Sequence, residues 1–154
     1  MKVTLDQIKR LREQTKAGVM DCRRALEESQ GDFERAKEWL RQKGIQSAAK
    51  RADRETCQGL IETYSHHEGK IVAVVELLCE TDFVARTEEF KKLAHELAMQ
   101  VAAMDPQNTK ELLRQSYIRD EKKKVGELVK EASGRFGENI KVGRIARFEL
   151  SGRT

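Results

Sequence analysis

The chain has 154 residues, which is the usual size of one domain or of two small ones. Charged residues make up 36% of it, yet 30 Lys and Arg nearly balance 26 Asp and Glu, so the formal net charge is only +4. This balance indicates a solvated surface and does not demand a nucleic-acid partner. The three cysteines form no CxxC pair, which favours structural thiols in a reducing compartment. The chain also lacks the apolar core of a signal peptide and any apolar run long enough to span a bilayer, so we expect a cytosolic protein with no membrane contact.

Residues 1–45 predict three short helices separated by glycine-containing breaks. Asp32 is expected to cap the third helix, and Gly44 is expected to end it in a left-handed conformation. Three helices of this size would have a poor core on their own, so we expect a docking module attached to a larger domain. Residues 46–58 contain few large apolar side chains and are expected to form a solvated connector.

From residue 59 on, the hydrophobic period changes from helical to extended. Residues 60–65 and 70–79 predict a β-hairpin whose loop is closed by Gly69. The second of these strands is apolar on both faces, so it is expected to lie at the centre of a sheet.

Two further helices and one strand complete the predicted core domain, residues 59–154. Apolar residues at helical spacing predict a helix over 90–101 that lies on the sheet, and a second helix over 125–136 after a short connection. Alternation predicts a last strand whose buried face carries Ile140, Val142, Ala146, Phe148 and Leu150. The expected fold class is α+β: a helical head, a connector, and a small, mainly antiparallel three-stranded sheet with helices on one side.

Sequence patterns typical of enzymes are missing. The chain has no GxxxxGK phosphate loop, GxSxG elbow, HExxH helix or GxGxxG turn. His66 and His67 are neighbours in the predicted hairpin and should point to opposite faces, while His95 lies on a charged helix, so we expect no metal site. Residues 134–137 match the GxxG loop of KH domains, but here they follow a helix and precede a strand, which favours helix termination. We therefore expect no catalytic residues and no cofactor.

The junction between the central strand and the following helix, residues 81–86, is the best candidate for a functional site. A large apolar side chain beside a carboxylate at such a turn either anchors the turn in its own core or inserts into a partner. Phe83 lies seven residues before Phe90 and would share its core-facing stripe if the helix began early. From the residues alone, both interpretations stay open.

The junction also resembles a known signature. Thr81-Asp82-Phe83-Val84-Ala85-Arg86, preceded by Glu80, is similar to the motif of the elongation factor Ts family. Thr87 stands where the family usually has Asn, and both residues can cap a helix. Residues 11–26 resemble the family's N-terminal module, which belongs to the ubiquitin-associated-like three-helix class. Residues 48–52 resemble its connector, and residues 137–140 with 147–150 resemble its closing strand. Longer members insert a helical hairpin where this chain has only about residues 106–115, and the sequence predicts no particular oligomeric state.

The resemblance implies a guanine-nucleotide exchange factor that acts on elongation factor Tu, in its GDP-bound and nucleotide-free states, during translation elongation. It implies that Phe83 enters an apolar pocket of the G domain, while Asp82 disturbs the elements that order Mg²⁺ and the phosphates. Thr81 and Val84 would set the turn that presents them. The metal and the nucleotide would belong to the partner. A second contact would come from the N-terminal module through Arg12, Ala17, Gly18, Val19 and Met20.

Two alternatives from other classes remain. One is an RNA-binding domain of the translation apparatus that uses Arg135, Lys141, Arg144 and Arg147. The other is a ubiquitin-associated-like interaction module in which residues 1–45 carry all the recognition. Neither explains why the strongest match lies at residues 80–90, and we expect no nucleic acid among the partners.

Overall fold

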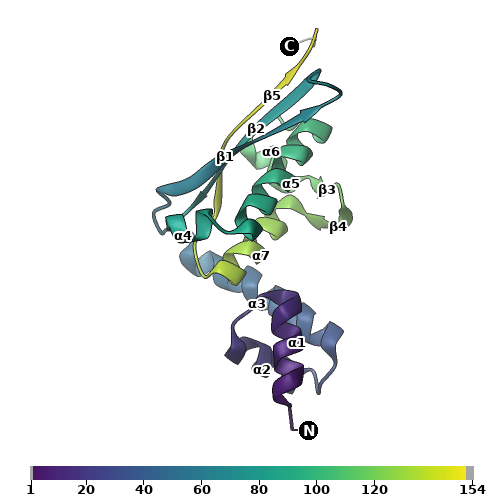
Figure 1. Ribbon diagram of the computed structural model, residues 1–154, viewed down its shortest axis with the longest axis vertical. Coiled ribbons are helices and arrows are strands. Elements are labelled where there is room, and N and C mark those ends of the chain that lie inside the picture. Colours follow the sequence, from purple (N-terminus) through teal and green to yellow (C-terminus); the bar gives the residue numbers. More distant parts are fainter. Residues whose placement is uncertain (1, 152–154) are drawn as a thin grey trace. The chain divides into compact units, whose positions relative to one another are not determined.

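The computed structural model describes residues 2–151. The chain divides into two units: the first contains the residues up to Ala52 together with Lys130–Glu138, and the second contains Asp53–Val129 together with the residues from Asn139 on (Figure 1). N-terminal helices precede a three-stranded antiparallel sheet, so the predicted α+β fold is confirmed. The boundaries 1–45, 46–58 and 59–154 stay a prediction.

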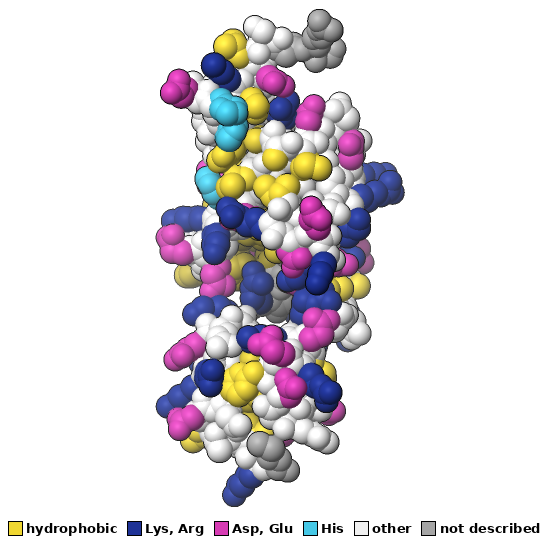
Figure 2. Space-filling view, turned by 90° about the vertical axis from the view of Figure 1, so that its right-hand side faces the viewer, with side chains coloured by type: hydrophobic (Ala, Val, Ile, Leu, Met, Phe, Trp, Pro, Cys, Tyr) yellow, Lys and Arg dark blue, Asp and Glu magenta, His cyan; other side chains and the backbone are white. Residues whose placement is uncertain are grey.

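The surface has the mixed charge that the composition predicts. On the face drawn in Figure 2, Lys and Arg side chains lie among Asp and Glu side chains. None of the helices within residues 2–151 has the length and the apolar character needed to cross a membrane.

The first unit begins with the helices α1 (Leu5–Thr15), α2 (Val19–Glu28) and α3 (Phe33–Arg51). The predicted cap of α3 is confirmed, because the Asp32 carboxylate accepts hydrogen bonds from the backbone N–H groups of Glu34 and Arg35. A small apolar core holds the three helices together and contains Ile8, Leu11, Cys22, Ala25, Leu26 and Ala36.

The prediction that Gly44 ends the third helix is wrong. Helix α3 continues through Gly44 to Arg51. Gly44 instead lies against Gly134 of α7 (Val125–Phe136), where a Cβ atom added to Gly134 would be 2.3 Å from the Gly44 Cα atom. The missing side chains therefore allow a close approach of two helix backbones, a contact that local sequence does not reveal.

The second unit contains the sheet, with the strand order β1 (Gln58–His66), β2 (Ile71–Cys79) and β5 (Lys141–Glu149). Both pairings are antiparallel, and β2 is central as predicted. Alternate residues of β2, among them Val75 and Leu77, are fully buried and face α5 (Glu88–Met104), which packs on β1 and β2 (Figure 1). The helical spacing of α5 places its apolar stripe, Phe90, Leu93, Leu97 and Val101, in this core.

The β1–β2 hairpin differs from the prediction at its histidines. The rings of His66 and His67 lie 4.1 Å apart between centroids, although successive strand residues should point to opposite faces. His67 has already left the strand and has a left-handed φ of 49°, so the alternation of faces no longer applies to it.

Strand β5 contains a β-bulge. Val75 pairs with Ile145 and Leu77 pairs with Val142, so between these pairs β2 has one residue and β5 has two. Because side chains alternate with a period of two, the extra residue moves every later side chain of β5 to the other face.

The bulge overturns the predicted buried face of the last strand. Arg147 pairs with the buried Ala73, whereas Phe148 and Leu150, which were expected inside, are 67% and 71% exposed. The prediction was correct only before the bulge, at Ile140, which is buried, and at Val142, which is half-buried and pairs with the buried Leu77. A uniform alternation applied to the whole strand could not detect the change of face.

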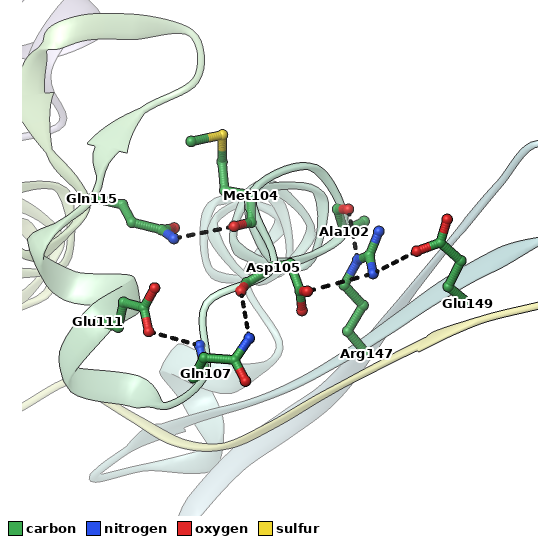
Figure 3. A network of polar contacts seen from close by, with 8 residues as sticks. All are labelled: Ala102, Met104, Asp105, Gln107, Glu111, Gln115, Arg147 and Glu149. Carbon is green, nitrogen blue, oxygen red and sulfur yellow. Dashed lines mark hydrogen bonds and ion pairs between the residues drawn. The ribbon is translucent and has the colours of Figure 1, made fainter. Parts of the chain in front are cut away.

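Residue Arg147 therefore reaches the C-terminal end of α5 (Figure 3). Its Nε atom donates to the Ala102 carbonyl oxygen at 2.9 Å, and its guanidinium lies 3.8 Å from the Asp105 carboxylate and 3.1 Å from the Glu149 carboxylate. The last carbonyl groups of a helix have no partner within the helix, so this cation stabilises the end of α5.

Residues 106–124 were predicted only as a connection, but they form α6 (Thr109–Arg114) and a hairpin of β3 (Ser116–Tyr117) and β4 (Asp120–Lys124). Polar side chains of α5 hold the hairpin. The Tyr117 hydroxyl donates to Glu96 at 2.8 Å, and Arg119 also donates to Glu96. Burial and the bond to Glu96 raise the pKa of Tyr117 to about 12. Burial alone would raise the pKa of Glu96, but the bonds from Arg119 and Tyr117 outweigh it and lower that pKa.

Candidate functional site

The junction after β2 forms a single helical turn, α4 (Asp82–Ala85), that is capped at both ends. Thr81 has an extended backbone and its hydroxyl accepts from the Val84 N–H at 3.4 Å. Thr87 caps α5 by accepting from the Phe90 N–H at 3.2 Å, and its hydroxyl donates to the Val84 carbonyl at 2.8 Å. Thr87 thus acts as a helix cap, the role that Thr can share with the Asn usual at this position in the family. Two threonines thus fix the start and the end of the turn.

Phe83 is the most exposed large apolar side chain of this turn, with 80% of its surface accessible. Phe90, by contrast, is fully buried. The two rings do not share a stripe, because α4 ends before α5 begins and the seven-residue spacing is broken at Arg86 and Thr87. Ala85 is the residue of α4 that is buried. Between the two interpretations left open by the sequence, the exposure excludes an anchor in the protein's own core.

Asp82 lies beside this ring and forms an ion pair with Arg86, at 2.9 Å between Oδ2 and Nη2. The side chains of Asp82 and Arg86 are 46% and 79% exposed. Exposed pairs of this kind contribute little to stability, so the Asp82 carboxylate can exchange its partner at a small cost in free energy.

Below the turn, polar contacts connect three segments of the second unit. The Asn139 backbone N–H donates to Glu80 Oε1 at 2.6 Å, and the Asn139 side-chain Nδ2 donates to the Arg54 carbonyl oxygen at 2.7 Å. The Arg54 guanidinium lies 3.6 Å from the same Glu80 oxygen. In addition, the Cys79 thiol donates to the Thr81 carbonyl at 3.1 Å. We call Arg54, Glu80 and Asn139 the base of the turn.

In the sequence, Glu80 and Asn139 stand only as parts of the matched segments, with no role of their own. For Glu80, a signal was available: it is a carboxylate at the end of a buried strand, directly before a capped turn. For Asn139 there was no such signal, because its partners are 59 and 85 positions away along the chain.

The residues expected to bind a partner through the N-terminal module lie at and next to the corner between α1 and α2. Val19 and Met20, at the start of α2, are 45% and 68% exposed. Arg12 and Gly18 are also exposed. Ala17 is half-buried and packs against the core of the first unit, so it shapes the corner more than it offers a contact.

The fold and the turn define an α+β protein that presents an aromatic side chain on a doubly capped turn. Residues 80–154 match the family described as Elongation factor TS. Elongation factor Ts of Thermotoga neapolitana is 42% identical over 193 aligned positions, which cover 97% of this chain and 98% of that protein. Those of Oleidesulfovibrio alaskensis and Rippkaea orientalis are also 42% identical, over 96% of this chain and over 98% and 78% of their own lengths. The chain belongs to the elongation factor Ts family and is a translation elongation factor.

The relatives are longer than this chain. The alignment with the Thermotoga neapolitana protein has 193 positions and this chain has 154 residues, so at least 39 positions have a residue only in the relative. This agrees with the expectation that longer members carry an insertion.

Proposed function

We propose that the protein is a guanine-nucleotide exchange factor for elongation factor Tu and that the Asp82-Phe83 turn promotes the release of GDP. The observation that carries this proposal is the 80% exposure of Phe83 on a turn held by hydrogen bonds at both ends. A large apolar ring that is exposed in the free protein and held on a short, capped turn is typical of an interface anchor.

The proposed action needs no covalent step, so the protein is not an enzyme in the chemical sense. Phe83 enters an apolar pocket of the G domain, and burial of such a side chain stabilises a complex by about 1.5–3 kcal/mol. Asp82 is carried with it toward the elements that order Mg²⁺ and the nucleotide phosphates, where even a small displacement of the ligands weakens GDP binding. Thr81 and Val84 keep the turn in the conformation that presents both side chains.

Exchange then follows from binding linkage. The factor binds the nucleotide-free state of its partner more tightly than the GDP-bound state, so GDP must weaken the binding of the factor by the same ratio. A coupling of about 4 kcal/mol corresponds to roughly a thousandfold change in either affinity.

The corner of the N-terminal module supplies a second contact with the same partner. Exposed Arg12, Val19 and Met20 are suited to this role. A second contact on one chain raises the effective concentration of the first. The metal and the nucleotide belong to the partner, the factor needs no cofactor of its own, and we place it in the cytosol, where elongation proceeds.

The two alternatives have less support. Two of the four cations named for RNA binding are engaged within the protein: Arg144 pairs with Glu76 at 2.8 Å, and Arg147 bonds to the end of α5. A module confined to residues 1–45 does not account for the family match, which begins at Glu80.

The substitution Phe83→Ala tests the proposal. We expect the exchange rate to fall more than tenfold in a folded protein, because the ring is exposed and its loss removes the anchor but no core contact. Stopped-flow release of fluorescent GDP from elongation factor Tu measures the rate, and circular dichroism measures folding. Phe148→Ala is the matched control, since it removes another ring, 67% exposed, from β5 and should leave the rate unchanged. An unchanged rate in folded Phe83→Ala would refute the proposed anchor.

A further inference from the structure

The base of the turn joins the end of β2 to the segments that precede β1 and β5. We infer that Glu80 and Asn139 are positioning residues that orient Phe83 for insertion into the GTPase, an inference that rests on the proposed exchange function. Neither side chain is expected to touch the partner. They act through the backbone of the segment that carries the ring.

Helix α4 is weak by itself. A helix of four residues has too few hydrogen bonds to be stable in isolation, so its direction must be set by the structure to which it is attached. On the N-terminal side, that attachment is the end of β2. Glu80 directly precedes the cap residue Thr81, so whatever holds Glu80 also directs the turn.

Glu80 is held by two other segments of the second unit. Its carboxylate oxygen receives the Asn139 backbone N–H at 2.6 Å and faces the Arg54 guanidinium at 3.6 Å. Asn139 is only 5% exposed and uses its side-chain amide to hold the Arg54 carbonyl at 2.7 Å. Glu80 is thereby joined to the segments that precede β1 and β5, and charge-assisted hydrogen bonds of this kind are stronger than neutral ones.

Because the base holds the turn in one direction, it lowers the entropic cost of binding the partner. If the turn were free to sample several directions, the factor would lose that conformational entropy each time it formed the complex. Loss of the base should therefore weaken productive encounter with the partner. It should leave the release step unchanged once the ring has been inserted.

The chain offers a matched control on the same strand. Glu76 is also a carboxylate of β2 and also pairs with an arginine, Arg144, at 2.8 Å. Its side chain is 20% exposed, compared with 22% for Glu80. However, Glu76 lies opposite the bulge of β5 and not at the turn.

The experiment measures catalysed GDP exchange with a small amount of full-length factor and increasing elongation factor Tu bound to fluorescent GDP. Glu80→Ala and Asn139→Ala should raise KM about tenfold, the effect of losing one well-made hydrogen bond, and should keep kcat within about twofold. Glu76→Ala should change neither constant. Glu80→Gln retains an acceptor oxygen for the Asn139 N–H but loses the charge that faces Arg54, so its KM should lie between those of the wild type and Glu80→Ala. If Glu80 and Asn139 only stabilised the fold, the substitutions would reduce the amount of folded, active factor. That would lower kcat and leave KM unchanged.

A double-mutant cycle connects the base to the ring. In the Phe83→Ala background, Asn139→Ala should have a smaller effect than in the wild type, because there is no ring left to orient and the turn presents only Asp82. Asn139→Ala keeps the backbone N–H that donates to Glu80 and removes only the side-chain bond to Arg54. This variant therefore provides the test if Glu80→Ala does not fold. An unchanged KM, a fall in kcat alone, or an equal effect of Asn139→Ala in both backgrounds would overturn the inference. If the wild-type protein does not accelerate GDP release, the proposed function itself fails, which is a distinguishable result.

Discussion

The contact between Gly44 and Gly134 predicts opposite effects for the same substitution on its two sides. A Cβ atom added to Gly134 would lie 2.3 Å from the Gly44 Cα atom and 3.0 Å from its carbonyl carbon. A Cβ atom added to Gly44 would have its nearest neighbour, the Gly134 Cα atom, at 3.6 Å, which is an ordinary contact. Gly134→Ala should therefore force the two helices apart, and Gly44→Ala should fit.

The magnitudes follow from these distances. Overpacking of this kind costs about 1–3 kcal/mol, and relief of the 2.3 Å contact requires movement of backbone, so the upper part of this range applies to Gly134→Ala. Replacing a helical glycine by alanine raises the free energy of unfolding by about 1 kcal/mol, since alanine has the higher helix propensity. We expect Gly134→Ala to lower the free energy of unfolding by about 1–2 kcal/mol and Gly44→Ala to raise it by up to about 1 kcal/mol.

Urea unfolding followed by the fluorescence of Trp39 is suited to this test. Trp39 is the only tryptophan of the chain and packs against the core of the first unit. Gly44 and Gly134 belong to the same unit. In a thermal experiment, 1 kcal/mol corresponds to about 2–4 °C for a protein of this size. If Gly134→Ala were as stable as the wild type, or Gly44→Ala lost as much stability as Gly134→Ala, the reasoning from close approach would be refuted.

Two further predictions concern the second unit. Arg147→Met should lower the free energy of unfolding by about 2 kcal/mol, because it removes the charged donor to the Ala102 carbonyl. Arg144→Met, at a side chain that is 84% exposed, should cost less than about 1 kcal/mol, and equal losses in thermal unfolding would contradict the assigned cap. The second prediction concerns alkaline pH. Burial and Glu96 raise the pKa of folded Tyr117 to about 12, above the value of about 10 for an unfolded chain. The contribution of Tyr117 is therefore fully present below pH 10 and is lost as the pH rises toward 12. Tyr117→Phe should reduce the loss of stability over this range in unfolding experiments at a series of pH values, and parallel curves for both proteins would contradict it.

Local sequence was sufficient for much of the fold. The caps at Asp32 and Thr87 depend on residues three positions away or fewer, and the cap at Asp32 was predicted correctly. The β1–β2 hairpin and the stripe of α5 follow from hydrophobic periods of two and 3.6 residues, which are also local. The motif at residues 81–86 identified where a functional turn should lie.

Other features depend on residues that are distant in the sequence, so the tertiary structure alone decided them. Gly44 lies inside α3 and packs against Gly134, and Phe148 faces outward because a bulge inserts one residue into β5. The position of Phe83 was left open for another reason. Its spacing from Phe90 allowed a place in the core, but the break between α4 and α5, although local, leaves the ring 80% exposed. Periodicity and capping are properties of short segments, whereas burial depends on which backbone from elsewhere in the chain occupies the adjacent space.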